Sequence, residues 1–238
     1  MAARLPRLRR RRRRINFADI AARFHRGIAE VDATIEPFAQ TWDEWNHDAL
    51  HADGPLWVTL GDSVTQGIGA STPAASFAAL VREHLRTETG QPWRLINLSM
   101  SGARFRDVVD HQLPVLHDYE LRPAVVSAVI GSNDYIWRRN TPAIAADAEE
   151  LVAALPADTI LSRVSEARPD RRRIAINRVF EDAGQQGRVR LYRAWDWPTG
   201  QGMWAQDNFH PNDRAHTHLA ANLIDAFITY GVTARSDR

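Results

Sequence analysis

The sequence predicts one α/β domain built on a five-stranded parallel sheet with helices on both faces. Short apolar runs alternate five times with longer segments of helical periodicity, which is the element order of a parallel sheet with crossover helices. The run at residues 124–130 is apolar at nearly every position, as expected of a strand buried on both faces. With 238 residues, the chain is long enough for one such domain and an appendage, and short for two full domains.

Each expected strand is followed by an expected helix. The strands are predicted at residues 56–60, 93–97, 124–130, 159–164 and 189–194. The helices are predicted near residues 74–88, 105–116, 144–154, 171–183 and 213–229. Because parallel strands end at one common edge, a functional site should lie in the loops that directly follow the strands.

The first 55 residues are predicted to form an arm, a helix and a linker. Residues 1–14 carry eight arginines and no acid, so we expect a disordered basic arm. Residues 15–35 and the irregular linker 36–55 follow, and the linker contains Trp42 and Trp45 without an assigned role. The helix is predicted from apolar side chains at steps of three or four: Phe17, Ile20, Phe24, Ile28, Val31 and Ile35. The domain proper spans residues 56–232, before a tail of residues 233–238.

The helix at residues 15–35 has two interpretations. It can pack against the body of the protein, which the acids on its polar side favour. It can instead lie on an anionic membrane surface, with the basic arm adding attraction, which would give a weak peripheral association through residues 1–35. We expect neither a secretory nor a twin-arginine signal, because the segment after the arginine run is amphipathic rather than apolar.

Charge and composition narrow the class of protein. All 30 basic residues are arginine and eight lie in residues 1–14, so the remaining chain holds 22 against 29 acids, a net charge of −7. An acidic body argues against a nucleic-acid-binding core. The chain has no cysteine, which excludes disulfides and thiolate chemistry and fits a reducing compartment. No apolar stretch reaches the roughly 18 residues of a spanning helix, and we expect a cytoplasmic protein.

Four positions follow the predicted strands where a site is expected. Ser63 follows the first strand and Gly102 the second. Asn133 follows the third strand and His210 the fifth. The gaps of 39 and 31 residues fit one strand–helix–strand unit each, and the gap of 77 residues fits two. All four positions can therefore meet at one rim of the sheet.

These residue types suit acyl transfer, which needs a nucleophile, a base and donors for the oxyanion. The Ser63 hydroxyl is inert at neutral pH unless a base takes its proton, and the imidazole of His210 titrates near neutrality. Asp207 is three residues before His210 and can accept a hydrogen bond from its Nδ1, which fixes the tautomer. The backbone N–H groups of Ser63 and Gly102 and the side-chain amide of Asn133 can donate to the oxyanion.

The four blocks resemble those of the GDSL, or SGNH, hydrolase superfamily. The family pattern has a GDS block at the first strand, then a glycine block, a GxND block and a DxxH block. The chain matches it with Gly61-Asp62-Ser63, Gly102, Gly131-Ser132-Asn133-Asp134 and Asp207-Asn208-Phe209-His210. The resemblance covers residues 56 to about 230 and departs from the family name only at Val64, a mild apolar change.

The resemblance implies a role for each matched residue. Ser63 would be the nucleophile, His210 the base and Asp207 its orienting partner. Gly102 and Asn133 would be oxyanion donors beside the N–H of Ser63. The resemblance further implies a flavodoxin-like three-layer α/β/α sandwich, which agrees with the strand count, and no metal or organic cofactor. The G-x-S-x-G elbow of the alternative serine hydrolase fold is absent from the sequence.

Large apolar side chains crowd the sequence beside two of these blocks. Trp137 follows the asparagine block. The segment before the histidine block contains Trp195, Trp197, Met203 and Trp204. Such side chains are either anchors that pin a loop to the body or the wall of an acyl or glycoside pocket. Trp137 and Trp204 are the candidates for substrate contact.

Histidines near the C-terminus raise the question of a metal site, since neutral imidazole binds zinc. His216 and His218 are two residues apart, so on a helix their side chains diverge by about 200°. We therefore expect surface and core histidines there, and no metal.

The sequence thus predicts a serine hydrolase that cleaves a carboxylic ester or thioester through an acyl-enzyme on Ser63, with His210 as the base. An acyltransferase that uses the same residues with an alcohol acceptor is the first alternative. A non-catalytic binding protein or membrane-surface adaptor on this fold is the second. The expected partner is a small-molecule ester, while its acyl chain length and the oligomeric state of the protein stay open.

Overall fold

A computed structural model describes residues 26–136, 140–166, 170–196 and 202–233. At its centre is a parallel sheet of five strands in the order β2-β1-β3-β4-β5. The strands are β1 (Leu56–Gly61), β2 (Arg94–Asn97), β3 (Val125–Val129), β4 (Thr159–Ser162) and β5 (Val189–Tyr192). Every predicted strand is present and all are parallel, so the predicted fold class is confirmed.

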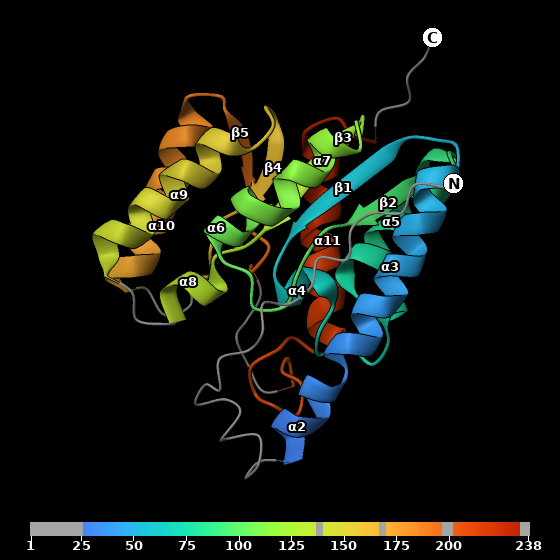
Figure 1. Ribbon diagram of the computed structural model, residues 1–238, viewed down its shortest axis with the longest axis horizontal. Helices are drawn as coiled ribbons and strands as arrows, with labels where there is room; N and C mark the ends of the chain where they lie inside the picture. Colours follow the sequence, from blue (N-terminus) through green and yellow to red (C-terminus); the bar gives the residue numbers. More distant parts are fainter. Residues whose placement is uncertain (1–25, 137–139, 167–169, 197–201, 234–238) are drawn as a thin grey trace.

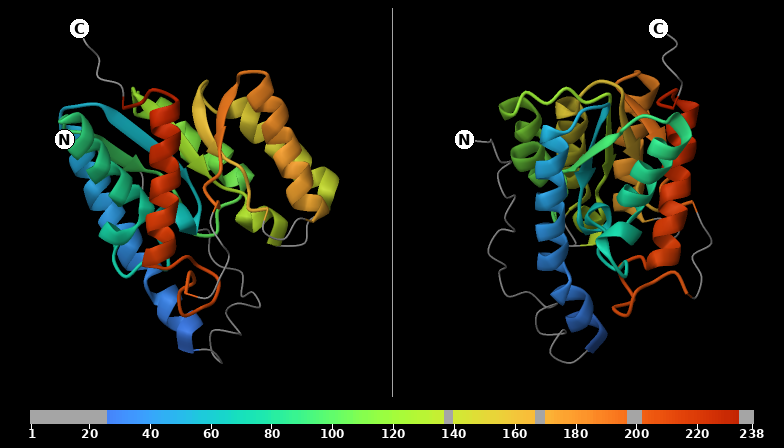
Figure 2. Two further views of the ribbon diagram at one scale, coloured as in Figure 1. Left: turned by 180° about the vertical axis from the view of Figure 1, so that it is seen from behind. Right: turned by 90° about the vertical axis from the view of Figure 1, so that its right-hand side faces the viewer.

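Helices cover both faces of this sheet (Figure 1). One face carries α6 (Phe105–Asp107), α7 (Leu113–Asp118), α9 (Thr141–Ala154) and α10 (Arg171–Gln185). The other face carries α5 (Phe77–Thr89) and α11 (Asp213–Thr229), which lie in front of the sheet when it is seen from behind (Figure 2). Helix α3 (Ile35–His51) packs along the edge strand β2.

The alternation of side chains along the strands divides the core between the two faces. Val58 and Leu60 of β1 belong to the cluster under α7, α9 and α10, whereas Trp57 belongs to the cluster under α5 and α11. Trp57 is fully buried, contacts Phe227 edge to face with ring centroids 5.4 Å apart, and donates its indole N–H to Ser127 Oγ at 2.9 Å. Each face of the sheet is thus an apolar layer that holds the strand ends rigidly.

Two short helices start at the carboxyl ends of the central strands. Helix α4 (Ser63–Gln66) follows β1, and helix α8 (Ser132–Ile136) follows β3. Both lie at the lower edge of the sheet in Figure 1, where the loop that leads into α11 also lies. The segment at 132–136, expected as a loop, is therefore one helical turn.

The linker predicted at residues 36–55 is wrong over most of its length, because residues 36–51 belong to helix α3. Phe38, Trp42 and Ala49 recur at helical spacing and are buried. Pro37 lies in the first turn of this helix, where a proline is tolerated because its missing N–H has no intrahelical partner.

The predicted amphipathic helix is described from Arg26 onward as α2 (Arg26–Ala33) and ends at a turn at Thr34. Residues 1–25, with the basic arm, lie outside the described residues. Val31 is buried in a small apolar cluster with Phe38, Ile68 and Ala70. The described part of the apolar stripe therefore packs on the body of the protein, which is the arrangement that the first of the two interpretations predicts.

Two of the predicted helices begin or run differently from the prediction. The helix expected at 105–116 consists of α6, a π-helical turn η2 (Val108–Gln112) and α7. The helix expected from residue 74 begins at Phe77, after the 3-10 turn η1 (Pro73–Ala75), because Ser76 caps it through the N–H of Ala79. Gln112, the last residue of the π-helical turn, is buried and bonds the backbone of Gly61 at the end of β1.

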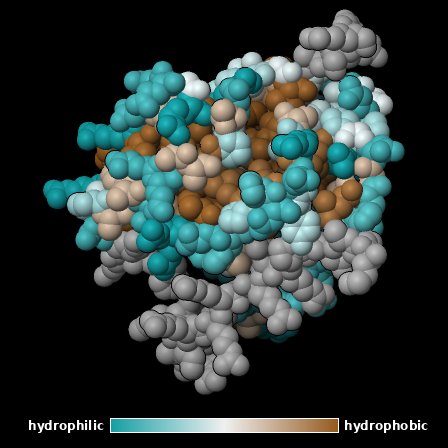
Figure 3. Space-filling model, turned by 45° about the horizontal axis from the view of Figure 1, so that its top comes forward, coloured by the Kyte–Doolittle hydropathy of each residue, from teal (hydrophilic) through white to brown (hydrophobic). Residues whose placement is uncertain are grey.

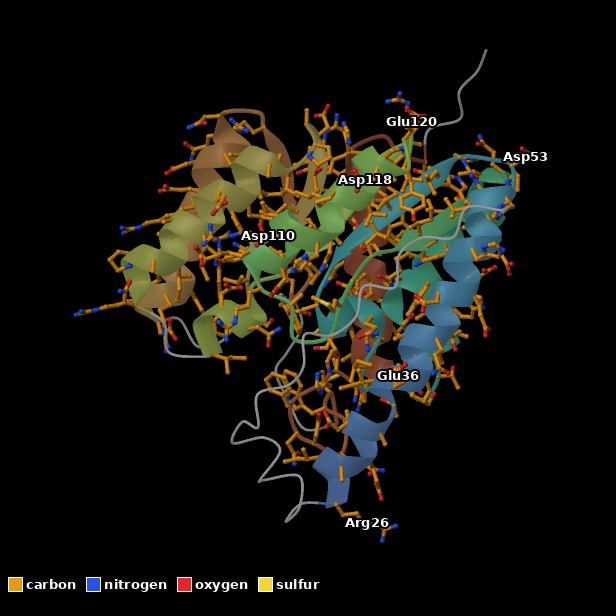
Figure 4. The ribbon with its side chains drawn as sticks, in the orientation of Figure 1. Arg26, Glu36, Asp53, Asp110, Asp118 and Glu120 are labelled. Atoms are coloured by element: carbon orange, nitrogen blue, oxygen red, sulfur yellow. The ribbon has the colours of Figure 1, made fainter. Side chains whose placement is uncertain are left out.

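The described surface agrees with the acidic balance of the body. Exposed carboxylates project from α3, from the β1 side and from the η2–α7 segment (Figure 4): Glu36, Asp53, Asp110, Asp118 and Glu120. Hydrophobic side chains show between hydrophilic ones on the upper face of the molecule (Figure 3). In the described residues we find no helix that combines the length and the apolar character needed to span a bilayer.

Candidate active site

Ser63 is held at the start of α4, where the central strand β1 ends. Asp62 caps this helix, since its Oδ1 accepts the N–H of Val64 at 3.0 Å. The Ser63 side chain is mostly buried, with 7% of the residue exposed. A helix of four residues has no stability of its own, so the surrounding loops must fix the direction of the serine.

Ser63, His210 and Asp207 form a continuous chain of hydrogen bonds. His210 Nε2 lies 3.0 Å from Ser63 Oγ, and His210 Nδ1 lies 2.5 Å from Asp207 Oδ2. Burial acts to raise the pKa of Asp207, but the hydrogen bond and charge of His210 and two backbone N–H groups outweigh it and lower the pKa below 3.8. The carboxylate is therefore ionised at neutral pH, Nδ1 carries the hydrogen, and Nε2 is free to accept the Ser63 hydroxyl.

The same carboxylate shapes the loop that presents the histidine. Asp207 Oδ1 accepts the backbone N–H groups of Phe209 and His210, each at 3.0 Å. Asn208 between them has φ 54°, in the left-handed region that asparagine tolerates better than most residues. Asp207 thus fixes both the backbone turn and the ring of His210.

The loop that contains Gly102 is held from two sides. Gln66, on the helix that begins at Ser63, accepts the N–H of Ser101 at 3.1 Å. Asn133 Nδ2 donates to Ala103 O at 3.0 Å. Asp134, next along α8, accepts the N–H of Phe105 at 3.2 Å. These three contacts place the loop between the helix that starts at Ser63 and the one that carries Asn133.

The groups predicted to donate to the oxyanion have N–H hydrogens that are not used in other hydrogen bonds within the described residues. Within the described residues, the backbone N–H groups of Ser63 and Gly102 find no acceptor. Gly102 has φ 80° and is exposed, so no side chain blocks the approach to its N–H. Asn133 uses one of its two amide hydrogens for Ala103 O, which leaves the second for another acceptor.

Gln112 bonds the end of β1 beside the candidate site and was not among the residues predicted from the sequence. It is fully buried, and its side-chain amide pairs with both backbone groups of Gly61: Oε1 accepts the N–H at 2.9 Å and Nε2 donates to the carbonyl at 2.8 Å. The edge strand β2 ends at Asn97 and pairs with β1 only as far as Thr59. Beyond that point Gly61 O also accepts the N–H of Met100 at 3.2 Å, so Gln112 and the segment after β2 together bond the last residue of β1. The sequence around it carries no signal of this role, because Gln112 directly follows the polar residues Asp110 and His111.

Two loops approach so closely at Gly69 that a side chain there would not fit. A Cβ at this position would lie 2.3 Å from Pro211 O and 2.8 Å from His210 Cβ. The φ of Gly69 is 99°, which itself favours glycine. The loop after α4 is further tied to α11 by the Ser71 N–H, which donates to Asp213 Oδ1 at 2.6 Å. The distance between Ser63 and His210 therefore depends on a glycine.

Of the two tryptophans predicted to contact the substrate, the structure describes only one. Trp137 lies outside the described residues. Trp204 is 36% exposed, and its backbone pairs with Pro211, the residue after His210. Phe209, 46% exposed, packs edge to face on the His210 ring. Met203 is buried, so the segment before the histidine combines an anchor and exposed aromatic surface.

His216 has a structural position on α11. It is buried, and burial lowers its pKa to about 4, so the ring is neutral at pH 7. Its Nδ1 accepts the N–H of Phe77 at 3.3 Å, and its ring stacks on that of Phe77. Among the residues that the structure describes, no three His, Asp or Glu side chains are grouped to hold a metal ion.

A parallel α/β sheet with a serine, a histidine and an aspartate in hydrogen-bond sequence at its carboxyl edge is typical of acyl-transferring hydrolases. Residues 59–218 match the model of the GDSL-like Lipase/Acylhydrolase family. The chain therefore belongs to this family, and it is an ester-hydrolysing enzyme. The resemblance seen in the sequence is confirmed.

Solved structures share the fold at low sequence identity. The structure of TesA is 24% identical, with a TM-score of 0.59 over 72% of this chain and 97% of TesA. The psychrotrophic esterase EstA from Pseudoalteromonas sp. is 20% identical, with a TM-score of 0.62 over 74% of this chain and 97% of EstA. The salicylyl-acyltransferase SsfX3 from a tetracycline biosynthetic pathway is 19% identical, with a TM-score of 0.52 over 76% of this chain and 57% of SsfX3. Among curated protein sequences, none matches this chain significantly.

Replacement of Gly69 by alanine should move His210 away from Ser63. The new Cβ would overlap with His210 Cβ and Pro211 O, so the histidine loop has to move. A displacement of this kind costs about a hundredfold in kcat/KM for an ester substrate, measured with p-nitrophenyl butyrate. The matched control is Gly90→Ala, which has φ 67° but no atom within 4 Å of the added Cβ. Equal kcat/KM in the two variants would contradict the prediction.

Replacement of Asp62 by asparagine should change how stability depends on pH. Burial raises the pKa of Asp62 from 3.8 to about 6, against the N–H of Val64 and the charge of His210. Because the folded protein binds this proton more tightly than the unfolded chain, the free energy of unfolding falls as pH rises from about 4 to about 6, by roughly 3 kcal/mol. Asparagine keeps the cap and removes this loss. In denaturant unfolding, the free energy of unfolding of the variant should therefore rise relative to that of the wild type as pH increases from about 4 to about 6.

The control for this experiment is Asp170→Asn at the start of α10. Asp170 is also a helix cap, but although burial acts upward, the N–H groups and charges of Arg173 and Arg172 lower its pKa. Its charged form therefore stabilises the fold above about pH 4, and its replacement should lower stability as pH rises. The prediction for Asp62 fails when the difference between wild type and Asp62→Asn is the same at every pH.

Proposed function

We propose that this enzyme cleaves a carboxylic ester or thioester through an acyl-enzyme on Ser63. The observation that carries the proposal is the chain of hydrogen bonds from Ser63 Oγ to His210 Nε2 and from His210 Nδ1 to Asp207. In the proposed reaction, His210 takes the hydroxyl proton as Ser63 Oγ attacks the carbonyl carbon. Asp207 stabilises the imidazolium and keeps the ring in the required tautomer.

The tetrahedral intermediate places a negative charge on the former carbonyl oxygen. We propose that the N–H groups of Ser63 and Gly102 and the amide of Asn133 donate to this oxygen, as their free hydrogens allow. Each such donor contributes on the order of a hundred- to a thousandfold in rate. The imidazolium then gives its proton to the leaving alcohol or thiol, and the acyl group stays on Ser63.

The second half of the reaction returns the enzyme to its starting state. Water loses a proton to His210 and attacks the acyl carbon, and the proton then returns to Ser63 Oγ as the carboxylic acid leaves. Trp204 and Trp137 are proposed to contact the substrate. The exposed ring of Trp204, next to the histidine loop, supports the first of these assignments.

Replacement of Ser63 by alanine should abolish turnover of p-nitrophenyl acetate and butyrate, because no nucleophile is left. The control is Ser71→Ala, a change at an exposed serine of the neighbouring loop that keeps the backbone N–H bonded to Asp213. A fluorophosphonate probe should label the wild type and Ser71→Ala at Ser63, and leave Ser63→Ala unlabelled; inhibition of the similar esterase EstA by monoethylphosphonate makes this probe suitable. Turnover by Ser63→Ala close to that of wild type would end the proposal.

An acyltransferase is the second candidate, which the similarity in fold to the acyltransferase SsfX3 keeps in view. The two activities share the acyl-enzyme and differ in what attacks it. Product analysis with an added alcohol distinguishes them, since a transferase forms the new ester in preference to the free acid. A series of p-nitrophenyl esters of increasing chain length, run beside acetylated sugars, would then define the acyl group.

A weak association with anionic membranes through the N-terminal region is proposed, together with a cytoplasmic location that cell fractionation would check. The membrane association is supported by the charge asymmetry between the basic residues 1–14 and the acidic body. Removal of residues 1–14 should abolish salt-sensitive binding to phosphatidylglycerol vesicles in a flotation assay, while neutral phosphatidylcholine vesicles bind neither protein. Equal binding of the full and the shortened chain to anionic vesicles would rule out the arm as the contact.

A further inference from the structure

The carbonyl groups of α4 cannot all be satisfied within the helix itself. In a helix of four residues, every carbonyl belongs to the unpaired last turn. The first two are bonded locally, since Ile68 N donates to Ser63 O at 2.9 Å and Gly67 N to Val64 O at 3.1 Å. The last two, those of Thr65 and Gln66, need partners from elsewhere in the chain.

Trp42 of helix α3 supplies one of these partners. Its indole Nε1 donates to Gln66 O at 2.9 Å, and both residues are buried, at 3% and 4% exposed. The side chain of the same Gln66 accepts the N–H of Ser101, beside the predicted oxyanion glycine. Trp42 therefore holds the residue that links α4 to the Gly102 loop.

Asn46, one turn further along α3, supplies the other partner through an intermediary. Its side-chain amide pairs with both backbone groups of Asn97, with 2.8 Å for each hydrogen bond. The side chain of Asn97 in turn donates to Thr65 O at 3.0 Å. The free edge of β2 and the end of α4 are thus joined to α3 through buried amides.

Apolar contacts from the N-terminal region continue the same attachment. Val31 and Phe38 cluster with Ile68 and Ala70, which follow α4 directly. Helices α2 and α3 precede the residues that match the family model, which begin at 59. A segment outside the family domain therefore makes both polar and apolar contacts to the helix that carries Ser63.

We infer that α3 is a positioning element of the active site, in which Trp42 and Asn46 fix the direction of α4 and, through Gln66, the Gly102 loop. The inference rests on the proposed role of Ser63. A solely structural α3 would stabilise the fold without affecting the rate per folded molecule. A positioning α3 changes the geometry of attack, which lowers kcat and leaves the binding of substrate nearly unchanged.

The test is Trp42→Phe in the full chain, compared with Trp45→Phe on the same helix. Phenylalanine keeps an aromatic ring at position 42 and removes the donor to Gln66 O. Trp45 is half-buried, packs on Trp42 and under Arg82, and its indole N–H makes no hydrogen bond within the described residues. A second variant replaces Trp42 by β-(3-benzothienyl)alanine, which keeps the bicyclic shape without the N–H and decides the matter where Trp42→Phe does not fold.

The readouts are kcat and KM for p-nitrophenyl butyrate and the rate of Ser63 labelling by a fluorophosphonate, per folded molecule and well below the unfolding temperature. Both Trp42 variants should lose about tenfold in kcat and in labelling rate, with KM within about twofold of wild type. Trp45→Phe should stay within about twofold of wild type in all three, even where its unfolding temperature falls.

Three results would count against the inference in distinguishable ways. Trp42 variants with the kcat of Trp45→Phe would overturn the positioning role while the proposed function stands. A loss that appears only in KM, or only in the folded fraction, would do the same. A wild type that neither turns over esters nor is labelled at Ser63 would remove the proposed function, and the inference with it.

Discussion

The structure depends on one constraint, which is that the buried backbone groups where β1 turns into α4 need hydrogen-bond partners, apart from the Ser63 N–H, which finds no acceptor within the described residues. Strand β2 ends at Asn97, and the segment after it still reaches β1, since the Met100 N–H donates to Gly61 O. The short helix α4 leaves the carbonyl groups of Thr65 and Gln66 without a partner inside the helix. Water cannot satisfy these groups, and an unpaired buried carbonyl or N–H costs on the order of 1–3 kcal/mol. Side-chain amides take the place of missing backbone: Gln112 at Gly61, and Asn97 at Thr65.

The same constraint explains why parts of the chain distant in sequence meet at the site. Gln112 lies 51 residues from Gly61, and His210 lies 147 residues from Ser63. The strands bring their loops to one edge, but they do not fix the loops to within the fraction of an ångström that attack on a carbonyl requires. That accuracy comes from Asp207, which bonds the turn and the ring of His210 together, and from Gly69, which lets the two loops touch.

Periodicity and order in the sequence were enough to predict the five strands, their parallel arrangement and the loops where Ser63 and His210 lie. The sequence analysis missed α3, whose buried residues Phe38, Trp42 and Ala49 gain their meaning from a packing partner, the edge of β2, that local patterns do not reveal. Gln112 escaped prediction for a related reason, because its partner is a distant backbone group, which has no signature in the sequence. Hydrogen bonds between a side chain and a distant backbone group can be recognised only in the folded structure.

Two carboxylates near Ser63 show how burial and hydrogen-bond donors compete to set the state of an acid. Asp207 accepts three hydrogen bonds from the histidine and its loop, and its pKa is lowered despite burial. Asp62 is more deeply buried and accepts the N–H of Val64, and its pKa rises to about 6. The charge of His210 acts to lower both pKa values, so a protonated imidazole attracts both carboxylates. In the proposed reaction, the imidazolium that forms on attack by Ser63 is therefore stabilised from two sides at pH values above about 6, where Asp62 is also ionised.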